Sequence, residues 1–409
     1  MRMKYVLIIG DGMGDEPIAE LGGKTPLEAA ATPVMDRLAR AGEQMLVRTV
    51  PQGYPPGSDV ANLSLLGYEP EKYYTGRAPL EAASMGVDLG VDELAFRCNL
   101  VTVERRGERM MMRDYSAGHI TTPESTALIT AVEEHCGTDR LRLYPGISYR
   151  HLLVLQGKPP ALTTVPPHDY LDQDVTDLYA EYLRVDYLKI LMEKSAAVLA
   201  DHPVNRERIR QGKNPANSLW LWGEGKSPDM PTLSERFGVT GALVSAVDLL
   251  KGIGVYAGLA VPEIEGATGY IDTNYAGKVK AALAALEKGD MAIVHLEGPD
   301  EAGHQGILAD KVQAIEDLDA KIIAPILHEL EKKEGPFRMV VCMDHYTPLS
   351  LRTHVDWPVP ILLYDSEGVV RASGRSYSEA GAEKSAAENE LAPVGGAIFF
   401  DRFILGARE

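Results

Sequence analysis

The chain has 409 residues, 45% of them hydrophobic and 24% charged, a globular composition that is long enough for two domains with buried cores. The formal net charge of -18, from 41 basic and 59 acidic residues, argues against nucleic acid or an anionic membrane as the main partner. No run approaches the roughly 18 apolar residues of a membrane span, and the cysteines Cys98, Cys136 and Cys342 are too scattered for a disulfide framework, so we expect a cytoplasmic protein.

The first predicted elements are a strand and a helix near the N-terminus. Residues 5–12, YVLIIGDG, form a short apolar run that ends at glycines and Asp11. In residues 32–42, TPVMDRLARAG, Thr32 is suited to cap a helix, Pro33 to occupy its first position and a glycine to end it. Together these segments predict a βα unit.

A single hydroxyl, that of Ser58, precedes the next helical run in the stretch PPGSDVANLSLLGY. Serine is a favoured N-cap, which by itself would explain the residue type. A helix N-terminus also offers free N–H groups and a positive dipole end, which stabilise a serine alkoxide or a phosphate bound to it. We therefore expect Ser58 to be the cap of its helix and also consider it a candidate nucleophile.

The middle of the chain, from about Asp92 to about Asn214, has a different pattern from the two ends. Residues 95–104 and 144–157 resemble hairpin strands, and residues 188–200 have helical periodicity. This mixture predicts a separate, smaller α+β domain, inserted at residues 92–214.

Strands and helices alternate again toward the C-terminus. Apolar strands are predicted at residues 291–298, 337–345 and 358–365, with an amphipathic helical stretch at 310–335. Apolar strands separated by such helices imply a parallel sheet covered by helices on both faces. The expected fold class is α/β, with a discontinuous core made of residues 1–91 and 215–409.

Side chains that can bind metals follow the predicted strands: Asp11, Asp300, His304, Asp344, His345 and His354. Asp300 and His304 stand four residues apart, which would put them on one face of a helical turn. Each of these residues alone could be an ordinary turn residue or a hydrogen-bonded loop histidine. Mixed aspartate and histidine ligands suit Mn²⁺ or Zn²⁺ better than Ca²⁺, and two neighbouring metals would favour phosphoryl transfer.

Seven stretches, taken together and in this order, resemble the archaeal-type 2,3-bisphosphoglycerate-independent phosphoglycerate mutases of the alkaline phosphatase superfamily. These stretches are IIGDGMGD, GSDVANLSLLGYEP, YYTGRAPLEA, AFRCN, GATGYIDTN, GPDEAGHQG and MDHYTPLSLRTH. The resemblance covers the whole chain and implies an alkaline-phosphatase-like core with an inserted domain that binds the glycerate moiety.

The resemblance also implies a ligand set and a reaction. One divalent ion would be held by Asp11, Ser58, Asp344 and His345, and a second by Asp300, His304 and His354. Ser58 would take the phosphate from phosphoglycerate and return it to the neighbouring hydroxyl, without 2,3-bisphosphoglycerate. The implied enzyme is therefore an isomerase of glycolysis that acts on a small phosphorylated metabolite, and a homo-oligomer is compatible with the sequence.

Cationic residues near the implied cleft are candidate clamps for the carboxylate and phosphate of the substrate: Arg77, Arg97, Arg150 and Lys251. For each of them a solvated surface role is the alternative. His119 and His151 are candidates to carry the proton between glycerate and phosphoserine, since imidazole titrates near neutrality.

One departure from the family keeps the phosphate acceptor open. The archaeal mutases tend to have arginine where this chain has His119, and the stretches PPHDYLDQD and NSLWLWGEGK resemble a bacterial branch that has been proposed to phosphorylate homoserine. The alternatives are therefore a homoserine phosphotransferase or another phosphatase of the superfamily, and, further away, a sulfatase or a catalytically silent metal-binding protein.

Overall fold

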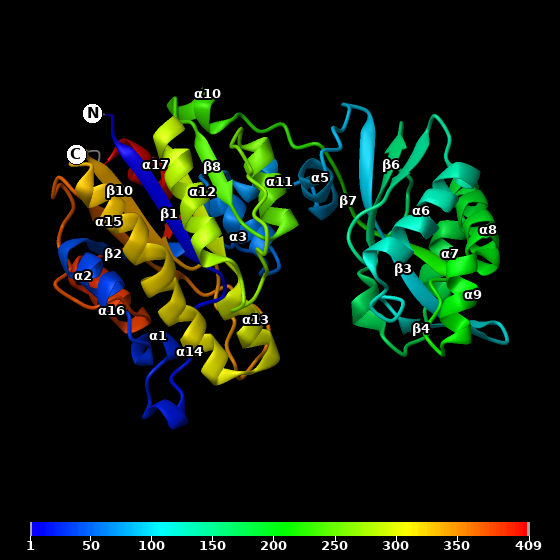
Figure 1. Ribbon diagram of the computed structural model, residues 1–409, viewed down its shortest axis with the longest axis horizontal. Helices are drawn as coiled ribbons and strands as arrows, with labels where there is room; N and C mark the ends of the chain where they lie inside the picture. The colour runs from blue at the N-terminus through cyan, green and yellow to red at the C-terminus, as the bar shows by residue number, and fades with distance from the viewer. Residues whose placement is uncertain (1, 407–409) are drawn as a thin grey trace. The chain divides into compact units, whose positions relative to one another are not determined.

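The computed structural model describes residues 2–406, which divide into two compact units. The core unit comprises Met1–Tyr74 and Asp229–Glu409, and the inserted unit comprises Thr75–Pro228 (Figure 1). The insertion expected from the sequence, residues 92–214, is shorter at both ends than the inserted unit. The difference arises because α5 (Arg77–Ser84) and β7 (Ser218–Lys226) both pack on β3 (Glu93–Arg106) of the inserted unit.

The core unit is built on one sheet. Among the described residues its seven strands follow the order β12 (Val394–Gly395), β2 (Glu43–Arg48), β11 (Val359–Asp365), β10 (Phe337–Cys342), β1 (Lys4–Gly10), β9 (Met291–Leu296) and β8 (Gly241–Val244). Strands β8, β9, β1 and β10 are parallel to one another. The expected α/β fold is therefore confirmed, with the predicted strands 5–12, 291–298 and 337–345 at its centre.

Strand β11 departs from the expected parallel arrangement, because it pairs antiparallel with both β10 and β2. A parallel return would need a crossover connection, which is usually a helix. Residues 343–358, all of them described, form turns and isolated bridges without a helix. This connection leaves three of the candidate ligands, Asp344, His345 and His354, on one loop.

Helices cover both faces of the core sheet (Figure 1). One group consists of helices that contact one another: α2 (Pro33–Ala41), α12 (Tyr275–Lys288), α14 (Leu308–Asp317), the π-helical η3 (Leu318–Ile323) and α15 (Ala324–Lys332). The other group comprises α3 (Ser58–Leu65), α11 (Asp248–Tyr256) and α17 (Gly396–Leu405). The predicted helical stretch 310–335 is thus one nearly continuous helix with a π-helical segment in its middle.

The start of α2 is capped from another part of the chain. Thr32 occupies the N-cap position, but among the described residues its side chain makes no capping hydrogen bond. Asp319, in the π-helical segment, accepts hydrogen bonds from the backbone N–H groups of Val34 and Met35 at 3.2 and 2.6 Å. Thr32 thus occupies the N-cap position, as predicted, but the capping hydrogen bonds come from a carboxylate 285 residues after Val34 in the chain.

The inserted unit has the predicted α+β composition. Its antiparallel sheet comprises β4 (Arg109–Asp114), β3, β6 (Arg150–Gln156), β5 (Leu141–Tyr144) and β7. Helices α6 (Thr122–Cys136), α7 (Thr176–Leu183), α8 (Asp186–Asp201) and α9 (Pro203–Arg210) lie against this sheet or one another around an apolar core that includes Phe96 and Trp220.

Short elements complete the fold: η1 (Ala19–Leu21), α1 (Pro26–Ala29), α4 (Pro70–Tyr73), η2 (Pro167–Tyr170), α10 (Leu233–Phe237), α13 (Gly298–Gln305) and α16 (Glu379–Glu388). The chain leaves the core unit after Tyr74 and returns at Asp229. Close to these two points, Tyr68 Oη donates a hydrogen bond to the carbonyl of Pro231 at 2.8 Å. No helix between residues 2 and 406 combines the length and the apolarity needed to cross a bilayer.

Candidate active site

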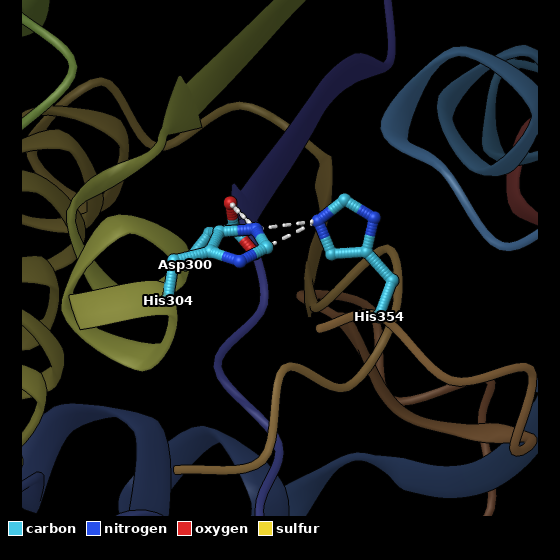
Figure 2. Close-up of side chains that lie close together, drawn as sticks. All are labelled: Asp300, His304 and His354. Carbon is cyan, nitrogen blue, oxygen red and sulfur yellow. Dashed lines mark hydrogen bonds and ion pairs between the residues drawn. The ribbon is translucent and has the colours of Figure 1, made fainter. Parts of the chain in front are cut away.

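The candidate ligands converge because three parallel strands end at the same edge of the core sheet. Asp11 follows β1, α13 follows β9, and Asp344 and His345 follow β10. Figure 2 shows Asp300 and His304 on α13 facing His354 on the loop after β10. We call these six residues the strand-end cluster.

Ser58 is the first residue of α3 and does not cap it. Gly57 occupies the N-cap position with an extended backbone, and among the described residues no side-chain cap is present. Capping geometry requires the non-helical residue before the first turn, so the prediction that Ser58 is the cap is wrong. The Ser58 Oγ instead lies 3.1 Å from His345 Nε2, at the border of the strand-end cluster.

The first part of the cluster surrounds His345. Its Nε2 lies 3.4 Å from Asp11 Oδ1 and 3.5 Å from Asp344 Oδ2. Asn62, one helical turn after Ser58, donates from Nδ2 to Asp344 Oδ2 and to the Ser58 carbonyl, each at 2.8 Å. Asn62 therefore ties the helix that begins at Ser58 to the loop after β10.

The second part comprises the three residues of Figure 2. His304 Nε2 is 3.3 Å from Asp300 Oδ2, and His354 Nε2 is 3.4 Å from Asp300 Oδ1. His304 Nδ1 donates to the carbonyl of Arg352 at 3.0 Å, which leaves Nε2 directed at the cluster. The hydroxyl of Thr347 donates to Asp300 Oδ1 and so fixes the carboxylate.

The pKa shifts show how strongly this charge is concentrated. Burial, followed by the nearby carboxylates of Asp344 and Asp300, raises the pKa of Asp11 well above its usual value. Burial would also raise the pKa of Asp300, but hydrogen bonds from His304 and His354 outweigh it and hold that pKa well below normal. The hydrogen bond to Asp300 raises the pKa of His304 to about 9.

The donor set fits divalent cations. Asp300, His304 and His354 offer ligand atoms within 4.8 Å of one another, and so do Asp11, Asp300 and His345. Asp11 Oδ1 is buried and has no hydrogen-bond partner among residues 2–406, as expected of an oxygen kept for a metal. The structure thus brings together all seven residues predicted from the sequence as ligands.

His295, which the sequence analysis did not predict, lies on β9 and contacts Asp11 of the strand-end cluster. Its side chain has no solvent exposure, and its Nε2 is 2.9 Å from Asp11 Oδ2. Burial lowers its pKa to about 4, so the imidazole is neutral at physiological pH. The signal was a single polar residue inside the apolar run MAIVHL.

Lys311 is a second buried residue that the sequence did not reveal. From α14, its ammonium donates to Asp15 Oδ2 at 2.7 Å, to the Gly14 carbonyl at 3.0 Å and to the Thr347 carbonyl at 2.8 Å. Gly14 and Asp15 lie on the loop after β1, and Thr347 lies on the loop after β10. Lys311 therefore joins the two loops that carry most of the cluster.

The arginines predicted to bind substrate gather in the inserted unit. Arg97 forms a bidentate ion pair with Glu81, with both N–O distances at 3.0 Å, and its guanidinium lies 4.0 Å from the centre of the Trp222 ring. Burial lowers the pKa of Arg97, and the positive charges of Arg77 and Arg150 lower it further. The side chains of Arg97 and Arg77 both border Gly223. Lys251, in the core unit, is instead paired with Glu263 at 3.2 Å.

The two histidines predicted as proton carriers differ in exposure. His119 is exposed, on a turn with a positive φ of 47°. His151 is 2% exposed, and burial lowers its pKa to about 3. Its Nδ1 accepts from the Gly146 N–H at 3.0 Å, while its Nε2 is buried and lacks a partner in the described chain. The structure therefore argues against His151 as a proton carrier.

His168 is an exposed histidine of the inserted unit that sequence reasoning did not single out. Its ring centre lies 5.5 Å from that of Trp222, the ring on which Arg97 stacks. Burial lowers its pKa, and among the charged groups acting on it are Arg97 and Arg77. His168 thus lies close to Arg97, through the Trp222 ring that both contact.

Comparisons with known proteins were made for the whole chain. A family model described as 2,3-bisphosphoglycerate-independent phosphoglycerate mutase matches residues 39–205. A probable mutase of this name from Geobacter sulfurreducens is 53% identical over 94% of this chain and 96% of its own length. A mutase of this name from Methanosarcina acetivorans is 51% identical over 89% of this chain and 91% of its own.

Solved structures agree over the full length. A Pyrococcus horikoshii protein is similar with a TM-score of 0.82 at 31% identity, covering 100% of this chain and 99% of that one. The cofactor-independent phosphoglycerate mutase from Thermoplasma acidophilum has a TM-score of 0.65 at 27% identity, covering 99% of this chain and 100% of that one.

Proposed function

The chain belongs to the family of 2,3-bisphosphoglycerate-independent phosphoglycerate mutases, and from this membership we propose that it interconverts 2- and 3-phosphoglycerate through a phosphoserine at Ser58. The observation that carries the assignment of the nucleophile is the 3.1 Å contact between Ser58 Oγ and His345 Nε2 at the strand-end cluster. The names of relatives at about 50% identity favour this activity over a homoserine phosphotransferase or a general phosphatase.

Two divalent cations, Mn²⁺ or Zn²⁺, complete the proposed site. One would be held by Asp11, Ser58, Asp344 and His345, and the other by Asp300, His304 and His354. When bound, the cations would lower the pKa of the Ser58 hydroxyl and neutralise charge on the phosphoryl group.

The residues of the chain would act in two symmetrical steps. Ser58 Oγ loses its proton and attacks the phosphorus of phosphoglycerate, the bond from phosphorus to the substrate oxygen breaks, and the glycerate keeps that oxygen, takes up a proton on it and stays in the site. The phosphoserine lies at the N-terminus of α3, where free N–H groups and the helix dipole favour an anion. The neighbouring hydroxyl of the glycerate then loses its proton and attacks the phosphoserine, the bond from phosphorus to Ser58 Oγ breaks, and Ser58 takes up a proton again.

The inserted unit would supply recognition of the glycerate. We assign the carboxylate and phosphate contacts to Arg77, Arg97 and Arg150, all in the inserted unit. Protonation of the leaving glycerate oxygen needs an accessible imidazole, and His119 and His168 are exposed while His151 is not. A cytoplasmic location is proposed as well, supported by three cysteines that are all free thiols.

The test is turnover of 3-phosphoglycerate to 2-phosphoglycerate by the purified, Mn²⁺-supplied protein without 2,3-bisphosphoglycerate. Conversion in these conditions is the expected result. Parallel assays offer homoserine with a phosphate donor, and p-nitrophenyl phosphate alone. Hydrolysis of the generic ester without conversion of phosphoglycerate would show that the core chemistry is right and the acceptor is wrong.

A further inference from the structure

His295 contacts the strand-end cluster, but the proposed reaction gives it no role. Its Nε2 lies 2.9 Å from Asp11 Oδ2. Its other ring nitrogen, Nδ1, lies 3.3 Å from the hydroxyl oxygen of Ser245, which directly follows the neighbouring strand β8. The buried imidazole therefore links Asp11 to the end of β8.

The direction of these hydrogen bonds follows from Ser245. Its Oγ accepts a hydrogen bond from the backbone N–H of Val247 at 3.0 Å. Within residues 2–406 the hydroxyl has one other partner, His295 Nδ1, so this nitrogen is the acceptor available to the hydroxyl proton. A neutral imidazole that accepts at Nδ1 carries its own proton on Nε2, and that N–H is directed at Asp11 Oδ2.

We propose that Ser245 and His295 orient Asp11 so that its Oδ1 faces the first cation, an inference that rests on the two-cation site proposed above. The hydrogen bond from His295 occupies Oδ2. Oδ1 is buried without a hydrogen-bond partner in residues 2–406, and it lies 3.4 Å from His345 Nε2. His295 is thus a positioning residue, because it acts on the cation through the carboxylate.

A direct role for His295 would look similar in the positions of the heavy atoms. Ligand atoms of Asp11, His295 and Asp344 also lie within 4.8 Å of one another. A cation bound by His295 Nε2 would require that nitrogen to be unprotonated, so the ring proton would move to Nδ1. The Ser245 hydroxyl would then lose its acceptor. The two arrangements therefore differ in which ring nitrogen carries the proton.

The first experiment determines this proton directly. Nitrogen-15 NMR of histidine-labelled protein distinguishes the two tautomers, and the His295 signals are assigned from their loss in His295→Gln. The measurement is made on metal-free protein and on protein loaded with Zn²⁺, which is diamagnetic. The Nε2–H tautomer is expected in both states. The Nδ1–H tautomer would overturn the proposal.

The second experiment measures Mn²⁺ affinity by calorimetry on variants whose folding is verified by circular dichroism. His295→Leu removes the donor and should weaken one of the two Mn²⁺ sites by about 10–100-fold. His295→Gln keeps an N–H donor near the position of Nε2 and should largely restore the affinity. Ser245→Ala frees the ring to change tautomer and should give an intermediate loss. Ser195→Ala, which also removes a fully buried hydroxyl, is the matched control.

Two outcomes contradict the positioning role. An equal loss in His295→Gln and His295→Leu would make the imidazole a direct ligand, and unchanged affinity in His295→Leu would remove His295 from the metal site. If the unsubstituted protein bound no Mn²⁺, the proposed two-cation function would fail instead. The tautomer in the metal-free protein would still decide whether the hydrogen-bond chain exists.

Discussion

The Nε2 atoms of His304 and His354 lie 2.8 Å apart. At this distance either one of the two nitrogens carries a proton or both bind the same cation. Two lone pairs at this distance would otherwise repel each other, and Asp300 adds a negative charge beside both rings. A bound cation should therefore stabilise the fold as well as support turnover. At a Mn²⁺ concentration about 100 times the dissociation constant, the gain would be about 2.7 kcal/mol for one site.

The measurement is thermal unfolding in EDTA and in Mn²⁺, with turnover assayed in the same samples. We expect a higher Tm with Mn²⁺ and no turnover in EDTA, with both restored when Mn²⁺ is added back. The variant His304→Ala/His354→Ala should lose the part of the Mn²⁺-dependent rise in Tm that comes from the second cation and keep the part that comes from the first. An equal rise in this variant would place the cation elsewhere.

Replacement of Ser58 by alanine should separate catalysis from folding. Because Gly57 is the N-cap and the Ser58 hydroxyl faces His345, the substitution removes no capping hydrogen bond. We expect Ser58→Ala to change the free energy of unfolding by less than about 0.5 kcal/mol and to reduce turnover by at least about 10³-fold. Urea unfolding and the conversion assay measure the two effects. A large loss of stability would mean that the hydroxyl supports the helix after all.

Lys311 should matter more to stability than its single charge suggests. Substitution by methionine would leave the Asp15 carboxylate and two loop carbonyls without their buried donor. We expect Lys311→Met to lower the free energy of unfolding by roughly 3–5 kcal/mol. Lys321→Met removes an ammonium that is half exposed and paired with Asp317, and it should change stability little. Similar urea midpoints for the two variants would contradict the conclusion that Lys311 stabilises the fold by joining the two loops.

Glu379 should make stability depend on pH. Burial raises its pKa from 4.5 to about 7, against the hydrogen bonds from Thr25 and Asp15. The folded state therefore keeps a proton that the unfolded chain loses above pH 4.5, so the stabilising contribution is complete below pH 4.5 and lost as the pH rises through about 7. The loss is on the order of 3 kcal/mol.

The measurement compares urea unfolding of the unsubstituted protein and Glu379→Gln from about pH 4 to about pH 8. The glutamine variant cannot titrate at this position, so its stability relative to the unsubstituted protein should increase with pH. Parallel pH profiles would show that the carboxyl titrates alike in the folded and unfolded states.

The sequence revealed the central strands and the cluster that follows them, because apolar runs and the residue types at their ends are local signals. The orientation of β11 was not local: it depends on a loop that returns without a helix. The capping of two helices also differs in part from the prediction. Asp319 supplies the hydrogen bonds expected from Thr32, from a distant segment, and Gly57 takes the position expected for Ser58.

Residues that position the cluster were harder to predict than the cluster itself. His295 lies in an apolar segment and Lys311 in an amphipathic one. Their partners, Asp11 and Asp15, are 284 and 296 residues away in sequence. For His151 the sequence predicted a functional role that the structure argues against. Its residue type suggested proton transfer, but its position on a strand buries the side chain. Burial of a polar residue, which is set by tertiary packing, decided each of these cases.

The hydrogen bond from Tyr68 to Pro231 joins the two segments of the core unit close to the points where the chain leaves it and returns. For the core unit, the 154 residues from Thr75 to Pro228 form one long loop, and this hydrogen bond holds the two ends of the loop together. Lengthening or exchanging such a loop changes the entropy of closure only slowly with its length. The insertion is therefore a replaceable segment: a unit of different length should close on the same hydrogen bond and leave the strand-end cluster in place.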